Sequence, residues 1–264
     1  MKQFIFFILF GCLFTNSLAA QSGYMSGNYK YCELSPSFNE KFKLGMEALS
    51  YKKYEGVAAK IFLDIVKQQP NSCDSFFWAG YSFRMQNRNK EAFACFYIAD
   101  SLNQNKSIEF KQSLAVTSFI IDKIDFSRAK YEEIIKFFPD SPEGYYGVAI
   151  TSPMIGDFKN GLDNVLIAIE KYGDRNNEIM NQTELMLGLL LALNKNYDTA
   201  LVHFDECSSK YKKDLNFNIY YSLSLLKVAE TNNDEKMKKQ AKKIYDRIAN
   251  KDDIPLDLQA EFKF

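Results

Sequence analysis

The 264-residue sequence contains one histidine and five cysteines, so it offers few side chains for metal binding or nucleophilic catalysis. It also lacks an excess of charge, because 33 lysines and arginines face 33 aspartates and glutamates. A nucleic-acid-binding protein normally carries excess positive charge to displace counterions from phosphates, so we expect no nucleic-acid partner. The 47% of hydrophobic and 15% of aromatic residues are enough to form a core, which excludes a disordered chain.

Long apolar runs are absent except at the start of the chain. Lys2 is followed by an apolar segment over residues 4–14 and by a small, polar stretch over residues 15–20. This order is typical of a secretory signal, and a helix needs roughly 20 apolar residues to span a membrane. We therefore expect a signal peptide over residues 1–20, no transmembrane segment after its cleavage, and an exported protein that is periplasmic or secreted.

A second interpretation of the same segment is lipoprotein processing. Leu9-Phe10-Gly11-Cys12 resembles a bacterial lipobox, and a lipid anchor on Cys12 would hold the protein at the envelope. The bulky Phe10 and the hydrophobic Leu13-Phe14 after the cysteine fit that pattern poorly. Cleavage after Ala20 is therefore the favoured prediction.

The rest of the sequence repeats with a period of about 35 residues. One series of small residues has separations of 34, 35, 34, 39 and 41, and consists of Ala58, Ala92, Ser127, Gly161, Ala200 and Ala241. Apolar residues follow each of them by four positions: Phe62, Phe96, Tyr131, Val165, Phe204 and Tyr245. A second, upstream series of small residues has nearly the same period and consists of Gly45, Gly80, Ala115, Ala149, Gly188 and Ser222. Two independent series thus define six units.

Each unit is predicted to be a helical hairpin. The two small residues of a unit lie about 12 positions apart, which leaves room for two helices of about a dozen residues and a tight turn. Turn-forming residues interrupt the pattern where a break is needed, at Asn87-Arg88-Asn89, Lys123-Ile124-Asp125, Gly156-Asp157 and Lys195-Asn196. Pro70, Pro139 and Gly173 fall where the second helix of a unit should end. We expect twelve or thirteen helices and essentially no sheet.

These units resemble the tetratricopeptide repeat family. The fourth unit carries the resemblance best, with Val148-Ala149, Gly156-Asp157-Phe158, Gly161, Val165 and Ala168. The resemblance implies an all-α fold, a right-handed α-solenoid of about six helix-turn-helix repeats over residues 37–254. A lead-in over 21–36 and a tail over 255–264 complete the chain. Extra residues near 172–181 and within 229–239 are expected to lie in loops.

The resemblance also implies a binding surface, because the first helices of tetratricopeptide repeats line a concave groove. Counting three residues back from, and one beyond, the upstream small residue of units two to six gives Gln112 and nine apolar or aromatic residues. The nine candidates for peptide binding are Phe77, Tyr81, Val116, Tyr146, Ile150, Leu185, Leu189, Ile219 and Leu223. Members that clamp acidic carboxylate tails place Lys, Arg and Asn there, and this chain lacks that set. The expected partner is a hydrophobic peptide or an amphipathic helix.

The function predicted from this surface is a non-enzymatic protein-interaction scaffold of the cell envelope. The alternative is a structural or oligomerising subunit of an envelope assembly, which would use the convex face and the terminal repeats. In that case curvature or the C-terminal segment, including Ile254 and Phe262, would fill the groove.

Catalytic, cofactor and metal sites are not predicted. The single histidine, His203, has Asp198 five residues before it and Glu206 and Cys207 after it, but a spacing of five places Asp198 off its helix face. No paired metal-ligand spacing, phosphate-binding glycine loop or nucleophile elbow is present.

The cysteines allow one disulfide. Cys207 takes a position that holds Ala99 and Ala168 in other units, so we expect it to be buried and unpaired. In a solenoid each unit contacts only its neighbours, so any bridge must come from Cys32, Cys73 and Cys95. Cys32 and Cys73 precede and open adjacent first helices, which makes their pairing the favoured disulfide, with unpaired thiols as the alternative.

Overall fold

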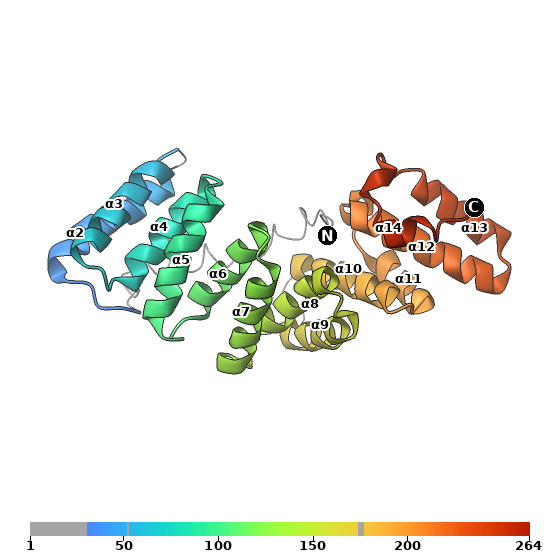
Figure 1. Cartoon of the computed structure of the whole chain (residues 1–264), viewed down its shortest axis with the longest axis horizontal. Helices are drawn as coiled ribbons and strands as arrows, with labels where there is room; N and C mark the ends of the chain where they lie inside the picture. The colour runs from blue at the N-terminus through green and yellow to red at the C-terminus, as the bar shows by residue number, and fades with distance from the viewer. Residues whose placement is uncertain (1–30, 52, 174–176) are drawn as a thin grey trace. The chain divides into compact units, whose positions relative to one another are not determined.

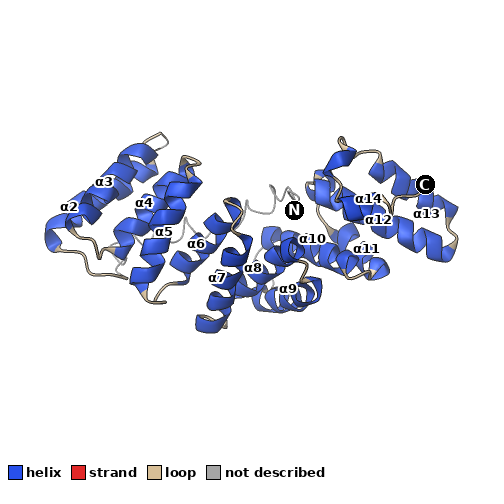
Figure 2. Ribbon diagram, in the orientation of Figure 1, coloured by secondary structure: helices blue, strands red, loops and turns tan. Residues whose placement is uncertain are grey.

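The computed structural model describes residues 31–51, 53–173 and 177–264 (Figure 1). The proposed signal peptide and Cys12 lie outside these residues. The described residues form thirteen α-helices and no strand, as the repeat pattern predicts (Figure 2). Within this part of the chain, no helix has the length and apolar character that crossing a membrane requires.

The helices follow one another as six pairs with short connections. The pairs are α2 (Asn39–Ser50) with α3 (Glu55–Gln68), α4 (Cys73–Met85) with α5 (Asn89–Asn103), α6 (Ile108–Ile120) with α7 (Ile124–Phe137), α8 (Pro142–Ile155) with α9 (Phe158–Tyr172), α10 (Asn177–Leu193) with α11 (Tyr197–Glu206), and α12 (Leu215–Asn232) with α13 (Glu235–Tyr245). A short α14 (Leu256–Gln259) and three 3-10 helices, η1 (Pro36–Phe38), η2 (Tyr211–Lys213) and η3 (Lys251–Asp253), complete the described elements.

The chain divides into two compact units, and the boundary between Gly144 and Tyr145 lies in the first turn of α8. The N-terminal unit holds repeats one to three, and the C-terminal unit holds repeats four to six. The sequence predicts one solenoid over 37–254, whereas the structure groups its repeats three by three. Each unit buries its own apolar core; that of the N-terminal unit includes Phe42, Phe62, Trp78, Phe96 and Phe110.

The repeated small residues lie where the two helices of a hairpin meet. A Cβ atom placed on Gly45 would lie 2.7 Å from the ring of Phe62. The same contact recurs between Gly80 and Phe96 at 2.9 Å. The upstream small residue of the first helix therefore makes room for the apolar residue of the second, which explains why both series keep one period.

A left-handed residue lies in the turn between the two helices of every repeat. The six residues with positive φ there are Lys53, Asn87, Asp122, Gly156, Lys195 and Asn233. In repeats two to six it is the first or second residue after the first helix, whereas α2 ends at Ser50 with an extended Tyr51, two residues before Lys53. In repeat two the N–H of Asn87 donates to the carbonyl of Arg84 and the N–H of Arg88 donates to the carbonyl of Phe83, both at 2.9 Å. These two bonds form a Schellman motif, which satisfies carbonyls that the helix end would leave unpaired.

The turn of repeat three lies earlier than the sequence predicts. The prediction places it at Lys123-Ile124-Asp125, but α7 already begins at Ile124 and the left-handed residue is Asp122. Asp125 is an acidic residue in the first turn of α7, where it faces the positive end of the helix dipole. Its polar character therefore reflects a helix start and not a turn.

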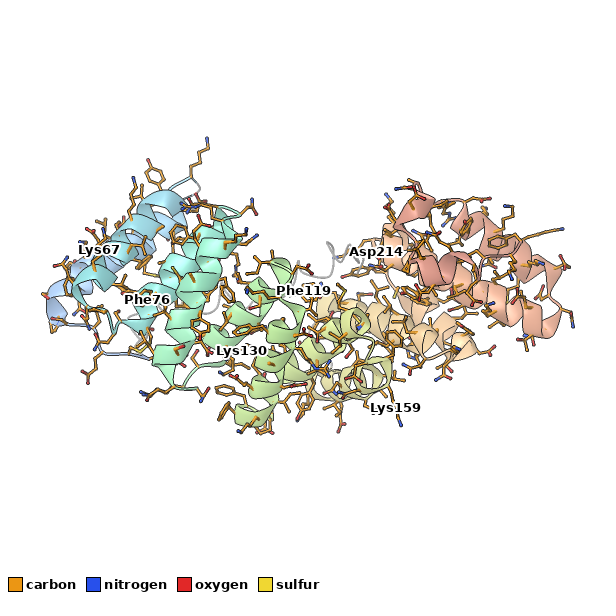
Figure 3. The ribbon with its side chains drawn as sticks, in the orientation of Figure 1. Lys67, Phe76, Phe119, Lys130, Lys159 and Asp214 are labelled. Carbon is orange, nitrogen blue, oxygen red and sulfur yellow. A yellow bond between two sulfur atoms is a disulfide. The ribbon has the colours of Figure 1, made fainter. Side chains whose placement is uncertain are left out.

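Repeat six accommodates its extra residues by lengthening helices, so the prediction of a loop insertion is wrong there. The left-handed Asn233 lies 11 residues after Ser222, compared with 7 between Gly188 and Lys195. Four extra residues correspond to about one helical turn, so the apolar face of α12 is preserved. Asp214, labelled in Figure 3, caps the start of α12 by accepting a hydrogen bond from the N–H of Phe217 at 3.0 Å.

The C-terminal tail packs on the last repeat. The ring of Tyr245 on α13 lies 4.8 Å from that of Phe262 and 5.2 Å from that of Phe264. Lys227 on α12 forms an ion pair with Glu261 at 2.7 Å. These contacts hold the tail against both helices of repeat six.

Candidate interaction site

The nine predicted groove residues are mostly buried. Eight of them, Phe77, Val116, Tyr146, Ile150, Leu185, Leu189, Ile219 and Leu223, are at most 4% exposed, and Tyr81 is half-buried. Gln112 is buried as well. The first helices thus direct these side chains into packed regions of each unit. Peptide binding by them stays a prediction.

An aromatic stack joins two neighbouring first helices in the N-terminal unit. The rings of Phe77 on α4 and Phe110 on α6 are stacked, with their centroids 4.4 Å apart. Tyr31, ahead of the first repeat, meets Phe110 edge-on at 5.4 Å. These contacts fill the space between the starts of α4 and α6. Both stacked rings are buried, and they lie near the starts of the two helices and away from their C-terminal ends.

Apolar side chains are exposed at those ends. Met85 and Ile120 are 44% and 38% exposed, and each lies five residues beyond the small residue of its first helix, Gly80 or Ala115. Met85 also lies one turn beyond Tyr81, whose ring packs against Trp78 at 5.3 Å. Sequence reasoning missed Met85 and Ile120 because it stopped one residue after the small positions. The spacing of i, i+4 from Tyr81 and Val116 was the signal that could have found them.

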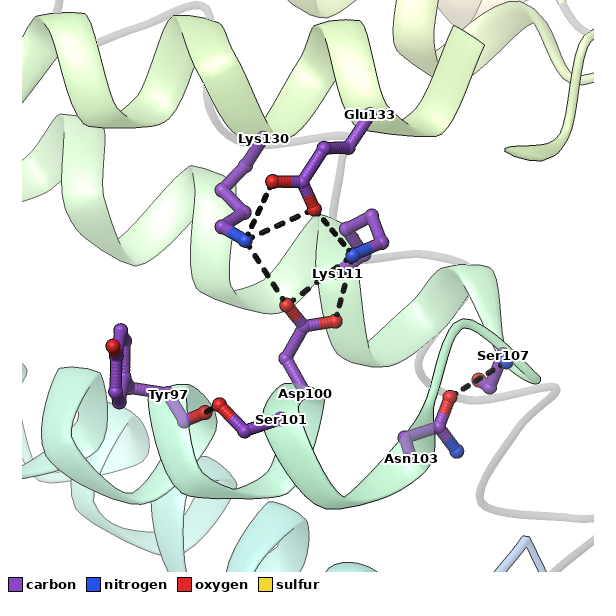
Figure 4. Close-up of polar contacts among 8 residues, drawn as sticks. All are labelled: Tyr97, Asp100, Ser101, Asn103, Ser107, Lys111, Lys130 and Glu133. Atoms are coloured by element: carbon purple, nitrogen blue, oxygen red, sulfur yellow. Dashed lines mark hydrogen bonds and ion pairs between the residues drawn. The ribbon is translucent and has the colours of Figure 1, made fainter. Parts of the chain in front are cut away.

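A partly buried cluster of four charges lies within the N-terminal unit (Figure 4). Lys111 on α6 is only 2% exposed and donates to Glu133 on α7 at 2.6 Å. It also pairs with Asp100 on α5 at 3.1 Å. Lys130 on α7 completes the cluster, at 2.8 Å from Glu133 and 3.4 Å from Asp100. Two lysines and two carboxylates balance, so the charges are compensated within the cluster.

The contacts of the cluster raise the pKa of Lys130 and lower that of Glu133. Burial disfavours the charged form of Lys130, but hydrogen bonding to Glu133 and the charge of Asp100 outweigh it and raise the pKa of Lys130. Burial also disfavours the charged form of Glu133, but its bonds to Lys111 and Lys130 lower the pKa of Glu133 overall. The cluster joins repeat two to repeat three, and its contacts favour the ionised forms of Lys130 and Glu133.

The structure gives His203 a partner that sequence reasoning did not consider. Its Nδ1 lies 2.6 Å from Oε2 of Glu184 on α10, and Glu206 follows one turn later on α11. Among the hydrogen bonds and ion pairs of the described residues, none joins Asp198 to His203, in agreement with its position off the helix face. Glu184 is 19 residues away in the sequence, and only the pairing of α10 with α11 brings it to His203.

A disulfide joins Cys32 to Cys73, with Cα atoms 5.6 Å apart. The backbone N–H of Cys32 donates to Oδ2 of Asp74 at 3.0 Å. The segment ahead of η1 is thus fixed to the start of α4. Cys95 and Cys207 are free and buried, and burial raises the pKa of these thiols to about 11 and about 12.

A polar surface pocket of about 270 Å³ lies at the start of α11. It is lined by Lys195, Asn196, Tyr197, Asp198, Thr199, Lys227, Val228 and Thr231. Lys227 is already paired with Glu230 at 3.3 Å and with Glu261 at 2.7 Å. One of the two lysines of the pocket is therefore already neutralised by carboxylates.

Comparison with solved structures identifies the fold. The sequence matches no protein-family model and no curated protein sequence. The structure is similar to PilF from Pseudomonas aeruginosa, with a TM-score of 0.57 and 13% identity over 84% of this chain and 95% of that one. It is similar to MamA from Desulfovibrio magneticus, with a TM-score of 0.58 and 11% identity over 66% of this chain and 94% of that one.

A third similar structure is YrrB, which is described as a tetratricopeptide repeat protein with an unusual peptide-binding site. Its TM-score is 0.55, with 13% identity over 77% of this chain and 95% of that one. At these identities the similarity concerns the fold and not the binding site. Together with the six helix pairs and their two series of small residues, it shows that this chain has the fold of tetratricopeptide repeat proteins.

Proposed function

We propose that the chain is a non-enzymatic protein-interaction scaffold that binds an apolar segment of a partner, a hydrophobic peptide or an amphipathic helix. The observation that carries this proposal is the exposure of Met85 and Ile120 at the same position of two successive first helices. YrrB, a protein of the same fold with a described peptide-binding site, supports it.

The physical basis of the proposal is the burial of apolar surface. Each Å² of apolar area removed from water stabilises a complex by about 25 cal/mol. An amphipathic helix presents apolar side chains at i, i+3, i+4 and i+7, which suits a site built from separate side chains on neighbouring helices. Tyr81 adds an aromatic ring beside Met85, and Arg84 lies over that ring at 5.3 Å.

The proposed location is the cell envelope or the exterior. Disulfides persist in oxidising compartments and are rare in the cytosol, so the Cys32–Cys73 bridge supports export through the signal peptide over residues 1–20. Attachment through a lipid on Cys12 is the alternative. Metabolic labelling with a fatty acid distinguishes the two, because only the lipoprotein incorporates the label at Cys12.

Crosslinking mass spectrometry in the native host tests the scaffold proposal. Met85→Asp and Ile120→Asp should keep the helical spectrum and the melting temperature but lose the crosslinked partner, because an unpaired charge would face an apolar ligand. Leu166→Asp is the matched control, since Leu166 is equally exposed but lies on the second helix α9. Retention of the partner by both test variants would contradict the proposed site.

A second function is favoured by exposed apolar residues on the first repeat. Leu44, Tyr51, Tyr54 and Val57 are all about half exposed or more on α2, α3 and their connection. Apolar surface on a terminal repeat fits a structural subunit that assembles through its end. Sedimentation of Leu44→Asp and Val57→Asp tests this proposal. If the chain assembles through its first repeat, both variants should sediment as smaller particles than the unmodified chain.

A further inference from the structure

Two charged clusters occupy the same position in repeats three and five. Glu184 lies four residues before the small residue of its first helix, as Lys111 does in repeat three. His203 and Glu206 lie three and six residues after the small residue of their second helix, where repeat three has Lys130 and Glu133. The hairpin geometry therefore brings three polar side chains together in both repeats.

The two clusters differ in charge. In repeat three, Lys111 and Lys130 neutralise Glu133 and Asp100. In repeat five, Glu184 pairs with His203. Among the ion pairs of the described residues, none joins a lysine or arginine to Glu184 or Glu206. Asp100 lies on the second helix of repeat two, next to the cluster of repeat three. The equivalent residue on the second helix of repeat four, before repeat five, is Ile169. The repeat-five cluster thus carries two carboxylates and no permanent positive charge.

The geometry of the repeat-five cluster suits a metal ion. One ligand atom from each of Glu184, His203 and Glu206 lies within 4.8 Å of the other two. Ligand atoms at about 2.0–2.2 Å from a zinc ion lie roughly 3.5 Å apart, so small side-chain rotations are sufficient. The side chains of His203 and Glu184 are 24% and 20% exposed, which leaves solvent access for the ion.

We propose that Glu184, His203 and Glu206 form a Zn²⁺ site between α10 and α11. One ring nitrogen of His203 and one oxygen of each glutamate are the protein ligands, and water completes the coordination. An imidazole with two carboxylates favours Zn²⁺ over Mg²⁺ and Ca²⁺, which prefer sites made of oxygen alone. The ion supplies the positive charge that Lys111 and Lys130 supply in repeat three, and it ties the two helices of the hairpin together.

The single histidine permits a direct test on the full chain with any affinity tag removed. Its ring signals are the only imidazole signals in an NMR spectrum. Titration with zinc sulfate should shift them until one equivalent is bound, whereas the same concentration of magnesium sulfate should leave them unchanged. An unshifted imidazole at saturating Zn²⁺ overturns the proposal without the need for any variant.

Variants then identify the carboxylates. Glu184→Gln and Glu206→Gln should each weaken Zn²⁺ binding measured by calorimetry by more than about tenfold, since even outer-shell partners of a metal contribute that much. Glu170→Gln is the matched control, because Glu170 is exposed on α9 and outside the cluster. Equal affinity in all three variants would overturn the assignment.

Cobalt substitution separates this site from the free thiols. Co²⁺ bound by oxygen and nitrogen gives weak visible absorption, whereas a cysteine ligand adds an intense thiolate band in the near ultraviolet. We expect no such band, because Cys207 and Cys95 are buried and neither belongs to the group of side chains that meet at His203. A strong thiolate band would place the metal on cysteine and overturn the proposal.

Discussion

Gly161 lies so close to Ser152 that a Cβ atom placed on it would be 2.5 Å from the Cβ of Ser152. It would also be 2.9 Å from a methyl group of Leu190, so the glycine sits where α9 meets α8 and α10. This contact explains why one of the repeated small residues is a glycine in repeat four.

A larger side chain at this contact should destabilise the C-terminal unit. Gly161→Leu and Ala200→Phe insert several carbons into packed, buried positions, and each should cost about 1–3 kcal/mol or more. Thermal or urea unfolding measures the loss. Gly56→Leu is the control: the space around Gly56 on α3 is open, with its nearest neighbour atom 3.7 Å away, so stability should hold or rise.

Substitutions at the left-handed turn residues of repeats four and five should have opposite effects on stability. Gly156 has a φ of 78°, and Gly156→Ala should lower stability by about 1 kcal/mol because a Cβ is unfavourable there. Lys195 has a φ of 64° at the same repeat position, so Lys195→Gly should be neutral or stabilising. Urea midpoints compare the two, and a stabilising Gly156→Ala would contradict the turn assignment.

The charged cluster of repeat three predicts a pH dependence. The pKa of Glu133 is lowered in the folded state, so its contribution to stability is complete above the ordinary pKa of glutamate, about 4.3. It is lost as the pH falls through the lowered value. The pKa of Lys130 is raised above the ordinary value for lysine, about 10.4. The contribution of Lys130 to stability is therefore complete below that ordinary value and is lost only as the pH rises through the raised pKa.

Urea unfolding of the unmodified chain and of Glu133→Gln between pH 3 and pH 8 checks this dependence. The difference in stability between the two proteins should shrink as the pH falls below about 4. Glu170→Gln should show no such trend, because Glu170 takes part in no ion pair of the described residues. A difference that stays constant with pH would show that Glu133 acts only by packing.

The disulfide should stabilise the N-terminal unit. The bridge joins residues 41 positions apart, and a bridge of this kind contributes about 2–4 kcal/mol. Reduction, or the double variant Cys32→Ser with Cys73→Ser, should lower the melting temperature. Thiol titration of the denatured, unreduced chain cleaved after Ala20 should count two thiols, Cys95 and Cys207. A count of four would show that the bridge does not form.

The sequence alone determined the helical hairpins and their number. Two series of small residues with one period defined six units, because the glycine of a first helix must make room for the ring of the second, as Gly80 does for Phe96. The turn positions follow less closely from the sequence. The sequence places the turn of repeat five correctly at Lys195, but it places that of repeat three one residue too late, because Asp122 adopts the left-handed conformation without the glycine that usually marks it.

Only the tertiary structure decided which side chains are accessible and which charges meet. Periodicity gives Leu189 and Tyr81 the same position in the first helices of their repeats, but neighbouring helices bury Leu189 and leave Tyr81 partly exposed. Glu184 and His203 lie on different helices, and their 2.6 Å contact depends on how the hairpin closes. A helix fixes the direction of its own side chains over one turn, whereas burial and charge pairing depend on what packs against that helix.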